Sequence, residues 1–150
     1  MANNSKHNWE IDKKDLEEVK EYIESYWPKL VRHHPKDLKS LIGLPNPYIV
    51  PADGEVFQEQ YYWDSYPVVR ALIDHPKYGD LAVGIVDNFL HMMERFGIVP
   101  NASRMYFLSR SQPPLLSSMV WTVYLKTKDK SWFKRAIKLI ELEYNDVWMG

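Results

Sequence analysis

A ten-residue stretch, FQEQYYWDSY at positions 57–66, concentrates aromatic and hydrogen-bonding side chains. A sugar ring has an apolar C–H face, and flat side chains such as Tyr61, Tyr62 and Trp63 offer that face a rigid partner. Glu59 and Asp64 can accept hydrogen bonds from the hydroxyl groups at the rim of the ring. The stretch therefore favours a carbohydrate-binding surface, although aromatic residues at the start of a helix also commonly belong to a core.

Glu59 and Asp64 also invite comparison with the acid and base of a glycosidase, whose two carboxyl groups flank one bond. Residues five positions apart are separated by roughly 140° around a helix, and they lie on opposite faces of a strand. Without an intervening turn, the two carboxylates would not flank one bond. The spacing favours a structural or substrate-binding role for each residue over a catalytic pair.

A second polar stretch, residues 98–112, carries the hydrogen-bonding side chains of Asn101, Arg104, Arg110 and Gln112. The guanidinium group of arginine offers a planar set of donors that suits carboxylates and sugar oxygens. The alternative is a loop whose polar side chains satisfy its own backbone, with Arg110 paired to an acidic residue of the scaffold. The spacing alone does not decide between these two interpretations.

Other chemistries find little support in the sequence. His33 and His34 are adjacent, and His91 has no second ligand at helical spacing, so we expect no metal site. Phosphate-loop, dinucleotide-turn and nucleophile-elbow motifs are absent, and we expect no cofactor. The sequence has no cysteine, which excludes disulfide and thiolate chemistry.

Charge and hydropathy restrict the classes of partner and the location that we expect for the chain. The sequence has 19 basic and 20 acidic side chains and a net charge of -1. It contains no dense basic block of the kind that binds nucleic acid. No segment approaches the roughly 20 apolar residues of a membrane span. The polar N-terminus lacks the apolar segment of a secretory signal, so we expect a cytoplasmic location.

The periodicity of apolar residues predicts an all-helical chain of 150 residues, about the length of one domain. We expect a first helix that begins near Asp12 and that kinks or restarts at Pro28. The other expected helices cover residues 64–74 and 80–96, a fourth that opens at Pro113 and Pro114, and a fifth that Ser131 caps. Proline-rich residues 33–54 and residues 98–112 are expected as long loops.

The segments FQEQYYWD (57–64) and PNASRMYFLSRSQPP (100–114) each lie just before an expected helix, so they could converge at one end of a bundle or barrel. In the fifth helix, the apolar side chains expected to point inward are Phe133, Ile137, Ile140, Tyr144 and Val147. Five helices do not pair off, and the fifth would lack a partner.

Five blocks resemble segments of the trehalases, the family 37 glycoside hydrolases, and they occur in the family's order. They are LPNPYIVP (44–51), FQEQYYWDSY (57–66), VDNF (86–89), IVPNASRMYFLSRSQPP (98–114) and LEYNDVWM (142–149). The run SRSQPP is nearly literal, and the resemblance covers about residues 25–149. It implies an (α/α)6 barrel whose loops enclose α,α-trehalose, which is hydrolysed with inversion to two glucose molecules.

Carried over residue by residue, the resemblance assigns seven positions to the substrate pocket. They are Phe57, Tyr61, Trp63, Asp64, Asn101, Arg110 and Gln112. The family's arginine before the phenylalanine is Val56 here, and the family's GG has become ADGE. The loss of that cation makes glycoside binding a firmer expectation than trehalose itself.

The family's catalytic acid lies in a later ESGWD-type segment and its base later still, and the 150 residues contain neither segment. The resemblance thus implies one partial domain, residues 1–150, from the N-terminal part of the barrel, by truncation, gene splitting or incomplete sequence. We expect the chain to be inactive alone and to expose apolar surface to itself or to a separate C-terminal half. The alternatives are a non-catalytic helical carbohydrate-binding or scaffold protein and a related (α/α)6 glycosidase with another substrate.

Overall fold

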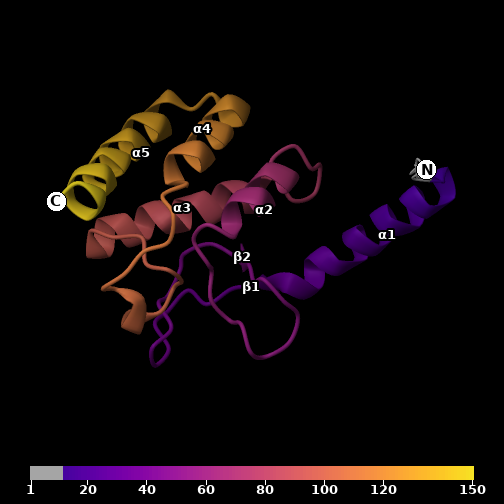
Figure 1. Ribbon diagram of the computed structural model, residues 1–150. Helices are drawn as coiled ribbons and strands as arrows, with labels where there is room; N and C mark the ends of the chain where they lie inside the picture. Colours follow the sequence, from indigo (N-terminus) through magenta and orange to yellow (C-terminus); the bar gives the residue numbers. More distant parts are fainter. Residues whose placement is uncertain (1–11) are drawn as a thin grey trace, which may run out of the picture.

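The computed structural model describes residues 12–150, and most of them are helical (Figure 1). The five helices are α1 (Lys13–Leu30), α2 (Ser65–Leu72), α3 (Gly79–Phe96), α4 (Leu116–Thr127) and α5 (Lys130–Leu142). A short 3-10 turn, η1 (Met105–Phe107), lies in the second long loop, and a wide π-type turn, η2 (Glu143–Trp148), follows α5. The five expected helices are thus confirmed. None of them is long and apolar enough to cross a membrane.

The ends of the first three helices follow from their capping residues. The Asp12 carboxylate caps α1 by accepting a hydrogen bond of 3.0 Å from the amide of Lys14. The helix passes through Pro28 to its end at Leu30, so the restart that we allowed at the proline does not occur. Helix α2 ends two residues earlier than expected, and α3 stops at Gly97, whose φ of 73° is the left-handed conformation expected of a C-terminal glycine.

Two helix starts differ from the sequence prediction. Pro113 and Pro114 precede α4 instead of opening it, since the helix begins at Leu116. Helix α5 is capped by Asp129, whose carboxylate accepts hydrogen bonds of 2.9 Å from the amides of Ser131 and Trp132. The N-cap residue of α5 is thus Asp129, and the prediction that Ser131 caps this helix was wrong.

Helices α2, α3, α4 and α5 pack in two layers around one core (Figure 1). Helices α2 and α4 contact each other, α3 packs against both, and α5 packs against α3 and α4. Phe89 of α3 and Met119 of α4 are completely buried in the core. This arrangement brings the N-terminal ends of α2 and α4 close together.

The face that α5 buries differs from the expected one. Ala136 and Leu139 are buried, and Phe133 and Ile140 pack partly against the core. Ile137 of α5 and Tyr144 of η2, which we expected to point inward, are exposed. Among residues 12–150, α5 packs against α3 and α4 on one side, and the side chains on its other side therefore face outward.

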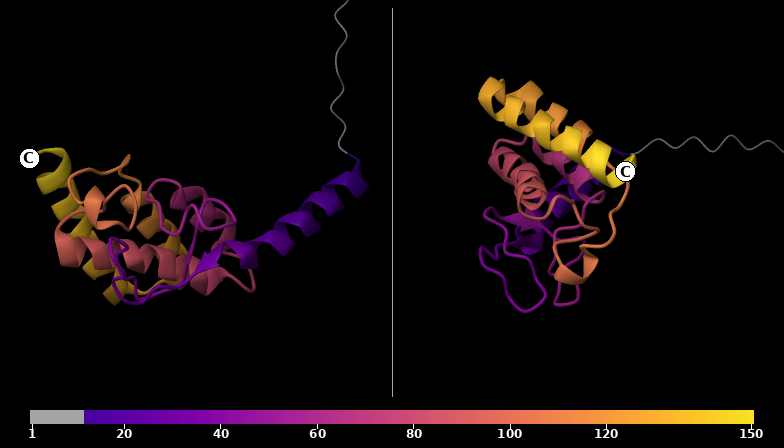
Figure 2. Two further views of the ribbon diagram at one scale, coloured as in Figure 1. Left: turned by 90° about the horizontal axis from the view of Figure 1, so that it is seen from below. Right: turned by 90° about the vertical axis from the view of Figure 1, so that its left-hand side faces the viewer.

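Helix α1 projects from the body of the molecule (Figure 2). None of its residues is buried, and its apolar residues Leu16, Val19 and Ile23 are exposed. Near the C-terminal end of the helix, Trp27 and Leu30 pack against the core. The helix predicted from this periodicity is therefore confirmed, but most of the apolar stripe of α1 has no partner among residues 12–150.

The proline-rich loop after α1 is an ordered part of the core. Strands β1 (Val31–Arg32) and β2 (Tyr48–Ile49) pair in antiparallel register at its two ends, a small departure from the all-helical prediction. Within the loop, Ile42 and Leu44 are completely buried. Part of this loop therefore belongs to the core of the molecule.

Candidate functional site

The two polar segments picked out from the sequence lie side by side. Tyr61 and Ala102 form a bridge between them, and the amide of Tyr62 donates to the carbonyl of Asn101 at 3.1 Å. The amide of Ser103 donates in return to the carbonyl of Gln60 at 3.0 Å. These bonds define the paired loops, residues 57–64 and 98–112, and confirm the expected convergence.

The paired loops lead into the N-terminal ends of α2 and α4. The amide of Leu116, the first residue of α4, donates to the hydroxyl of Tyr62 at 3.0 Å. Three residues after Tyr62, α2 begins at Ser65. Side chains from both loops are therefore held at one end of a rigid helix pair, where function commonly resides.

The aromatic site residues lie on the outer side of the first loop. Phe57 and Tyr61 meet edge to face, with their ring centroids 5.9 Å apart. Trp63 is 50% exposed and Tyr61 is half-buried. Partial burial, with a smaller contribution from the nearby Glu59 carboxylate, raises the pKa of Tyr61 above its ordinary value. The loop thus presents flat and neutral aromatic surfaces.

Tyr62 differs from its two neighbours, since it is completely buried and packs against Phe89 at a centroid distance of 5.2 Å. Tyr61 forms the bridge to the second loop, whereas residues 62–64 form the turn that leads into α2. No regular spacing in the sequence separates Tyr62 from Tyr61 and Trp63. Tyr62 belongs to the core, so the expectation that it offers its ring to a sugar was wrong, whereas its neighbours remain accessible.

The polar site residues of the second loop take different positions. The side-chain oxygen of Gln112 accepts from the amide of Trp63 at 3.1 Å, which joins the two loops a second time. The side-chain oxygen of Asn101 is buried and has no hydrogen-bond partner among residues 12–150. Arg110 is exposed, with its guanidinium carbon 4.9 Å from the ring centroid of Phe107. The described residues form no ion pair with Arg110, so the acidic scaffold partner is not found there.

Asp64 is half-buried beside the aromatic residues, and its side chain does not cap α2. With Tyr61 and Pro51 it lines a recess of about 30 Å³, which is large enough to hold water. A sugar ring does not fit into this recess. The described residues therefore present an open wall and not a closed pocket.

Glu59 has a supporting position in the core. The side chain is buried, and its carboxylate accepts hydrogen bonds from the guanidinium of Arg104 and, at 2.9 Å, from the amide of Gln58. Arg104 also donates to the hydroxyl of Ser40 at 3.0 Å. Because its oxygens are engaged in this buried cluster, Glu59 is not placed to exchange protons with a substrate.

A buried amide network attaches the first loop to α3. The side-chain amide of Gln60 donates to the carbonyl of Ile85, and that of Asn88 donates to the side-chain oxygen of Gln60, both at 2.9 Å. Asn88 also exchanges hydrogen bonds of 3.0 Å with the backbone of Asn46. Sequence reasoning placed Asn88 in a matched block but assigned it no role. These amides fix the loop from beneath.

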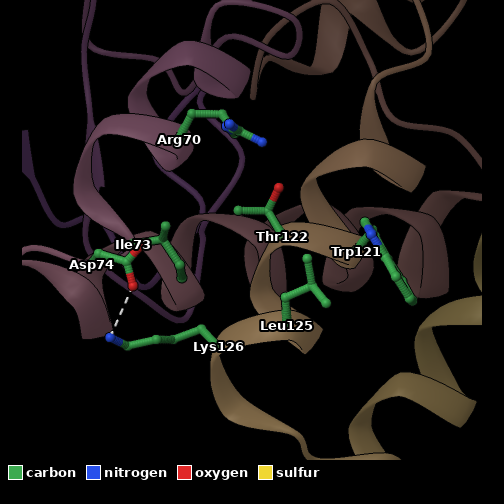
Figure 3. Close-up of a pocket in the computed structure, with 7 residues that line it drawn as sticks. All are labelled: Arg70, Ile73, Asp74, Trp121, Thr122, Leu125 and Lys126. Carbon is green, nitrogen blue, oxygen red and sulfur yellow. Dashed lines mark hydrogen bonds and ion pairs between the residues drawn. The ribbon is translucent and has the colours of Figure 1, made fainter.

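A hollow of about 390 Å³ lies between α2 and α4 toward their C-terminal ends (Figure 3). Its lining residues are Arg70, Ile73, Asp74, Trp121, Thr122, Leu125 and Lys126. An ion pair of 3.0 Å between Asp74 and Lys126 closes one edge. None of the site residues predicted from the sequence lines this hollow. Across residues 12–150, acidic residues and histidines form no cluster of three or more that could hold a metal ion.

Comparisons with known proteins place the geometry in context. The sequence model of the trehalase family matches residues 2–150. A trehalase of Arabidopsis thaliana is 44% identical over 108 residues, which cover 72% of this chain and 17% of that protein. A periplasmic trehalase of Xanthomonas oryzae is 38% identical over 133 residues, which cover 87% of this chain and 22% of that protein.

Among solved structures, the neutral trehalase Nth1 from Saccharomyces cerevisiae matches with a TM-score of 0.60 and 38% identity. The match covers 68% of this chain and 19% of the yeast chain. Together with the other alignments, it means that the chain spans about a fifth of the length of the relatives it matches.

Proposed function

Because this chain belongs to the trehalase family, we propose that its paired loops form one wall of the sugar pocket of a glycosidase that hydrolyses α,α-trehalose with inversion. Its helices form part of an (α/α)6 barrel. The observation that carries the proposal is the hydrogen-bonded pairing of residues 57–64 with residues 98–112 at the start of α2 and α4. This pairing gathers the seven residues expected to bind substrate at one end of the helices.

Each group in the wall has a chemical role in this proposal. Phe57, Tyr61 and Trp63 stack against the apolar face of a glucose ring. Arg110 donates to sugar oxygens, and the carboxylate of Asp64 accepts from sugar hydroxyls. The buried side-chain oxygen of Asn101, which has no partner among the described residues, accepts a hydrogen bond from substrate or water. Gln112 acts mainly by holding the backbone of Trp63 in place.

Bond cleavage needs two carboxyl groups on opposite sides of the glycosidic bond. Glu59 is engaged with Arg104 in the core, which leaves no such pair in the paired loops. We propose that residues 1–150 act as one partial domain and that the acid and base come from residues outside it, in the same polypeptide or in a separate chain.

The substrate could also be another α-glucoside or mannoside. The observation in favour is Val56, which is 82% exposed at the position where the family resemblance expects a sugar-contacting arginine. An apolar side chain there supplies no donor to a hydroxyl group. Isothermal titration of the chain against a panel of trehalose, maltose and methyl mannoside distinguishes the two cases.

The proposed function is tested with trehalose and a pair of tryptophan variants. Trp63 and Trp121 are almost equally exposed, at 50% and 51%, but only Trp63 lies in the paired loops. We expect Trp63→Ala to weaken trehalose binding about tenfold, in line with the loss of one aromatic stacking partner. Trp121→Ala is the matched control and should leave the affinity unchanged. Equal losses for both variants, or no binding by the unchanged chain, would contradict the proposal.

The role of the carboxyl groups is tested by glucose release. The 150-residue chain is expected to release no glucose from trehalose, because the proposed wall holds no acid and base pair. Measurable hydrolysis that disappears in Asp64→Ala would overturn this part of the proposal. Sugar binding that Arg110→Ala abolishes, without any hydrolysis after the rest of a barrel is supplied, would favour a non-catalytic carbohydrate-binding protein.

A further inference from the structure

A buried carboxyl group far along the chain contacts the centre of the first loop. Glu143, at the start of η2, is only 3% exposed. Its Oε1 accepts a hydrogen bond of 2.6 Å from the hydroxyl of Tyr62, 81 residues earlier in the sequence. Within residues 12–150 no basic side chain pairs with Glu143. Burial of a carboxyl group without a cation is costly, and a structure that keeps one needs its hydrogen bond.

The same hydroxyl group joins Glu143 to the start of α4. The hydroxyl oxygen of Tyr62 accepts a hydrogen bond of 3.0 Å from the amide of Leu116, and the same hydroxyl group donates its hydrogen bond to Glu143. The amide at the start of a helix has no partner inside the helix, so this bond satisfies a group that would otherwise be buried and unpaired. Tyr62 thus connects η2, α4 and the first loop through one oxygen atom.

The backbone of Tyr62 is held as firmly as its hydroxyl. Its amide donates to Asn101 of the second loop, and its carbonyl accepts from the amide of Ser65 at the start of α2, both at 3.1 Å. Tyr62 lies between Tyr61, which bridges to the second loop, and Trp63, which is inside the turn closed by the bond from Ser65 to Tyr62. A shift of the buried Tyr62 would therefore displace the backbone that carries both exposed rings.

We infer that Glu143 is a positioning residue of the sugar-binding wall: through the hydroxyl of Tyr62 it fixes the direction of Tyr61 and Trp63. The inference rests on the proposed function in one respect, namely that these two rings contact sugar. What the position requires is a hydrogen-bond acceptor of the right length. Glutamine, which keeps the carbonyl oxygen without the charge, meets this requirement, and alanine does not.

The first test measures hydrogen exchange of backbone amides and needs no sugar. In Glu143→Ala, the amides of Tyr62 and Trp63 should exchange about tenfold faster, while amides in the middle of α3 keep their rates. Glu141→Ala is the matched control, since Glu141 lies two residues away and is exposed. Unchanged rates at Tyr62 and Trp63 would overturn the inference. An equal rise throughout α3 would also overturn it, because Glu143 would then serve global stability alone.

Two further variants keep the test decisive even if Glu143→Ala does not fold. Glu143→Gln should exchange like the unchanged chain, because its side-chain oxygen can still accept from Tyr62. Tyr62→Phe removes only the hydroxyl and should show faster exchange at Trp63, as in Glu143→Ala. If the amides of Glu143→Gln exchange as fast as those of Glu143→Ala or Tyr62→Phe, the role of Glu143 is not to accept this hydrogen bond.

Sugar affinity separates the inference from the proposed function. If the unchanged chain binds trehalose, Glu143→Ala should weaken the affinity about tenfold and Glu143→Gln should preserve it. Equal affinity in all three proteins would overturn the positioning role and leave the proposed function intact. Absence of trehalose binding in the unchanged chain would instead refute the proposed function, and the exchange measurements would still decide the effect of Glu143 on the loop.

Discussion

At the scale of single residues, the candidate site depends on buried polar groups that are shielded from solvent. Gln60 and Asn88 are completely buried, and Glu59 is nearly so. Buried groups of this kind are costly unless they are hydrogen-bonded, and here each has a partner. They determine the path of the backbone, and the exposed rings follow from that path.

Replacing Asn88 should destabilise the chain through the groups that it leaves behind. Asn88→Ala removes a donor to Gln60 and to the carbonyl of Asn46, and it also removes the acceptor for the amide of Asn46. Since one buried unsatisfied group costs about 1–3 kcal/mol, we expect a loss of at least that size in the free energy of unfolding. Urea denaturation measures it. Asn145→Ala, at an exposed position, is the control, and an equal effect there would contradict the prediction.

At the scale of elements, the long loop after α1 is fastened to α3 by an ion pair. Arg95 of α3 donates to the carboxylate of Asp37 at 2.8 Å, and the amide of Gly43 donates to the same carboxylate at 2.7 Å. Gly43 lies so close to the backbone of Lys36 that a Cβ atom would come within 2.5 Å of it. Residues 37–43 therefore form a tight turn that the hydrogen bond between Asp37 and Gly43 closes. The ion pair between Asp37 and Arg95 attaches this turn to α3.

The pairing of Asp37 predicts a loss of stability in acid. The hydrogen bond from Arg95, followed by that from Gly43, lowers the pKa of Asp37 well below its ordinary value of 3.8. A carboxyl group whose pKa is lower in the folded chain stabilises the fold above its unfolded pKa, and this contribution disappears as the pH falls toward the folded pKa. Asp37→Asn should therefore be less stable than the unchanged chain at pH 7.

Urea unfolding at a series of pH values from 7 to 2 checks this prediction. The difference between the unchanged chain and Asp37→Asn should shrink below about pH 4. Asp37 is partly exposed, so added salt should also reduce the difference. The control is Glu21→Gln, at an exposed position of α1. A stability difference for Asp37→Asn that is independent of pH would show that the charge of Asp37 is not its cause.

At the scale of the whole molecule, the body formed by α2, α3, α4 and α5 has a dense core, whereas α1 extends away from it (Figure 2). The apolar stripe of α1 and the hollow between α2 and α4 are both open to solvent. Exposed apolar surface of this extent favours association. Self-association or a partner chain, as expected from the sequence, stays a prediction that sedimentation at several concentrations can check.

A pair of identical substitutions tests whether α1 contributes to the stability of the body. Val19 of α1 is 55% exposed and Val120 of α4 is completely buried. We expect Val120→Ala to lower the free energy of unfolding by about 2 kcal/mol through lost burial. Val19→Ala should change it by less than about 0.5 kcal/mol, as surface substitutions usually do. Thermal and urea unfolding at low concentration measure both, and an equal loss for Val19→Ala would mean that the stripe is covered in solution.

The sequence by itself determined the features that arise within a few residues. Apolar spacing identified all five helices, Gly97 marked the end of α3, and the polar blocks located the two loops that pair. Its resemblance to the trehalases was confirmed by the comparisons. These features depend on backbone hydrogen bonds and turn conformations that neighbouring side chains control, so they can be read from local spacing.

Only the tertiary structure decided which side chains are available for chemistry. It buried Tyr62 and left Trp63 exposed, it engaged Glu59 with Arg104, and it placed Glu143 against a residue 81 positions away. It also turned α5 so that Ile137 points outward. Burial and pairing depend on which distant segments meet, and local spacing carries no record of those contacts.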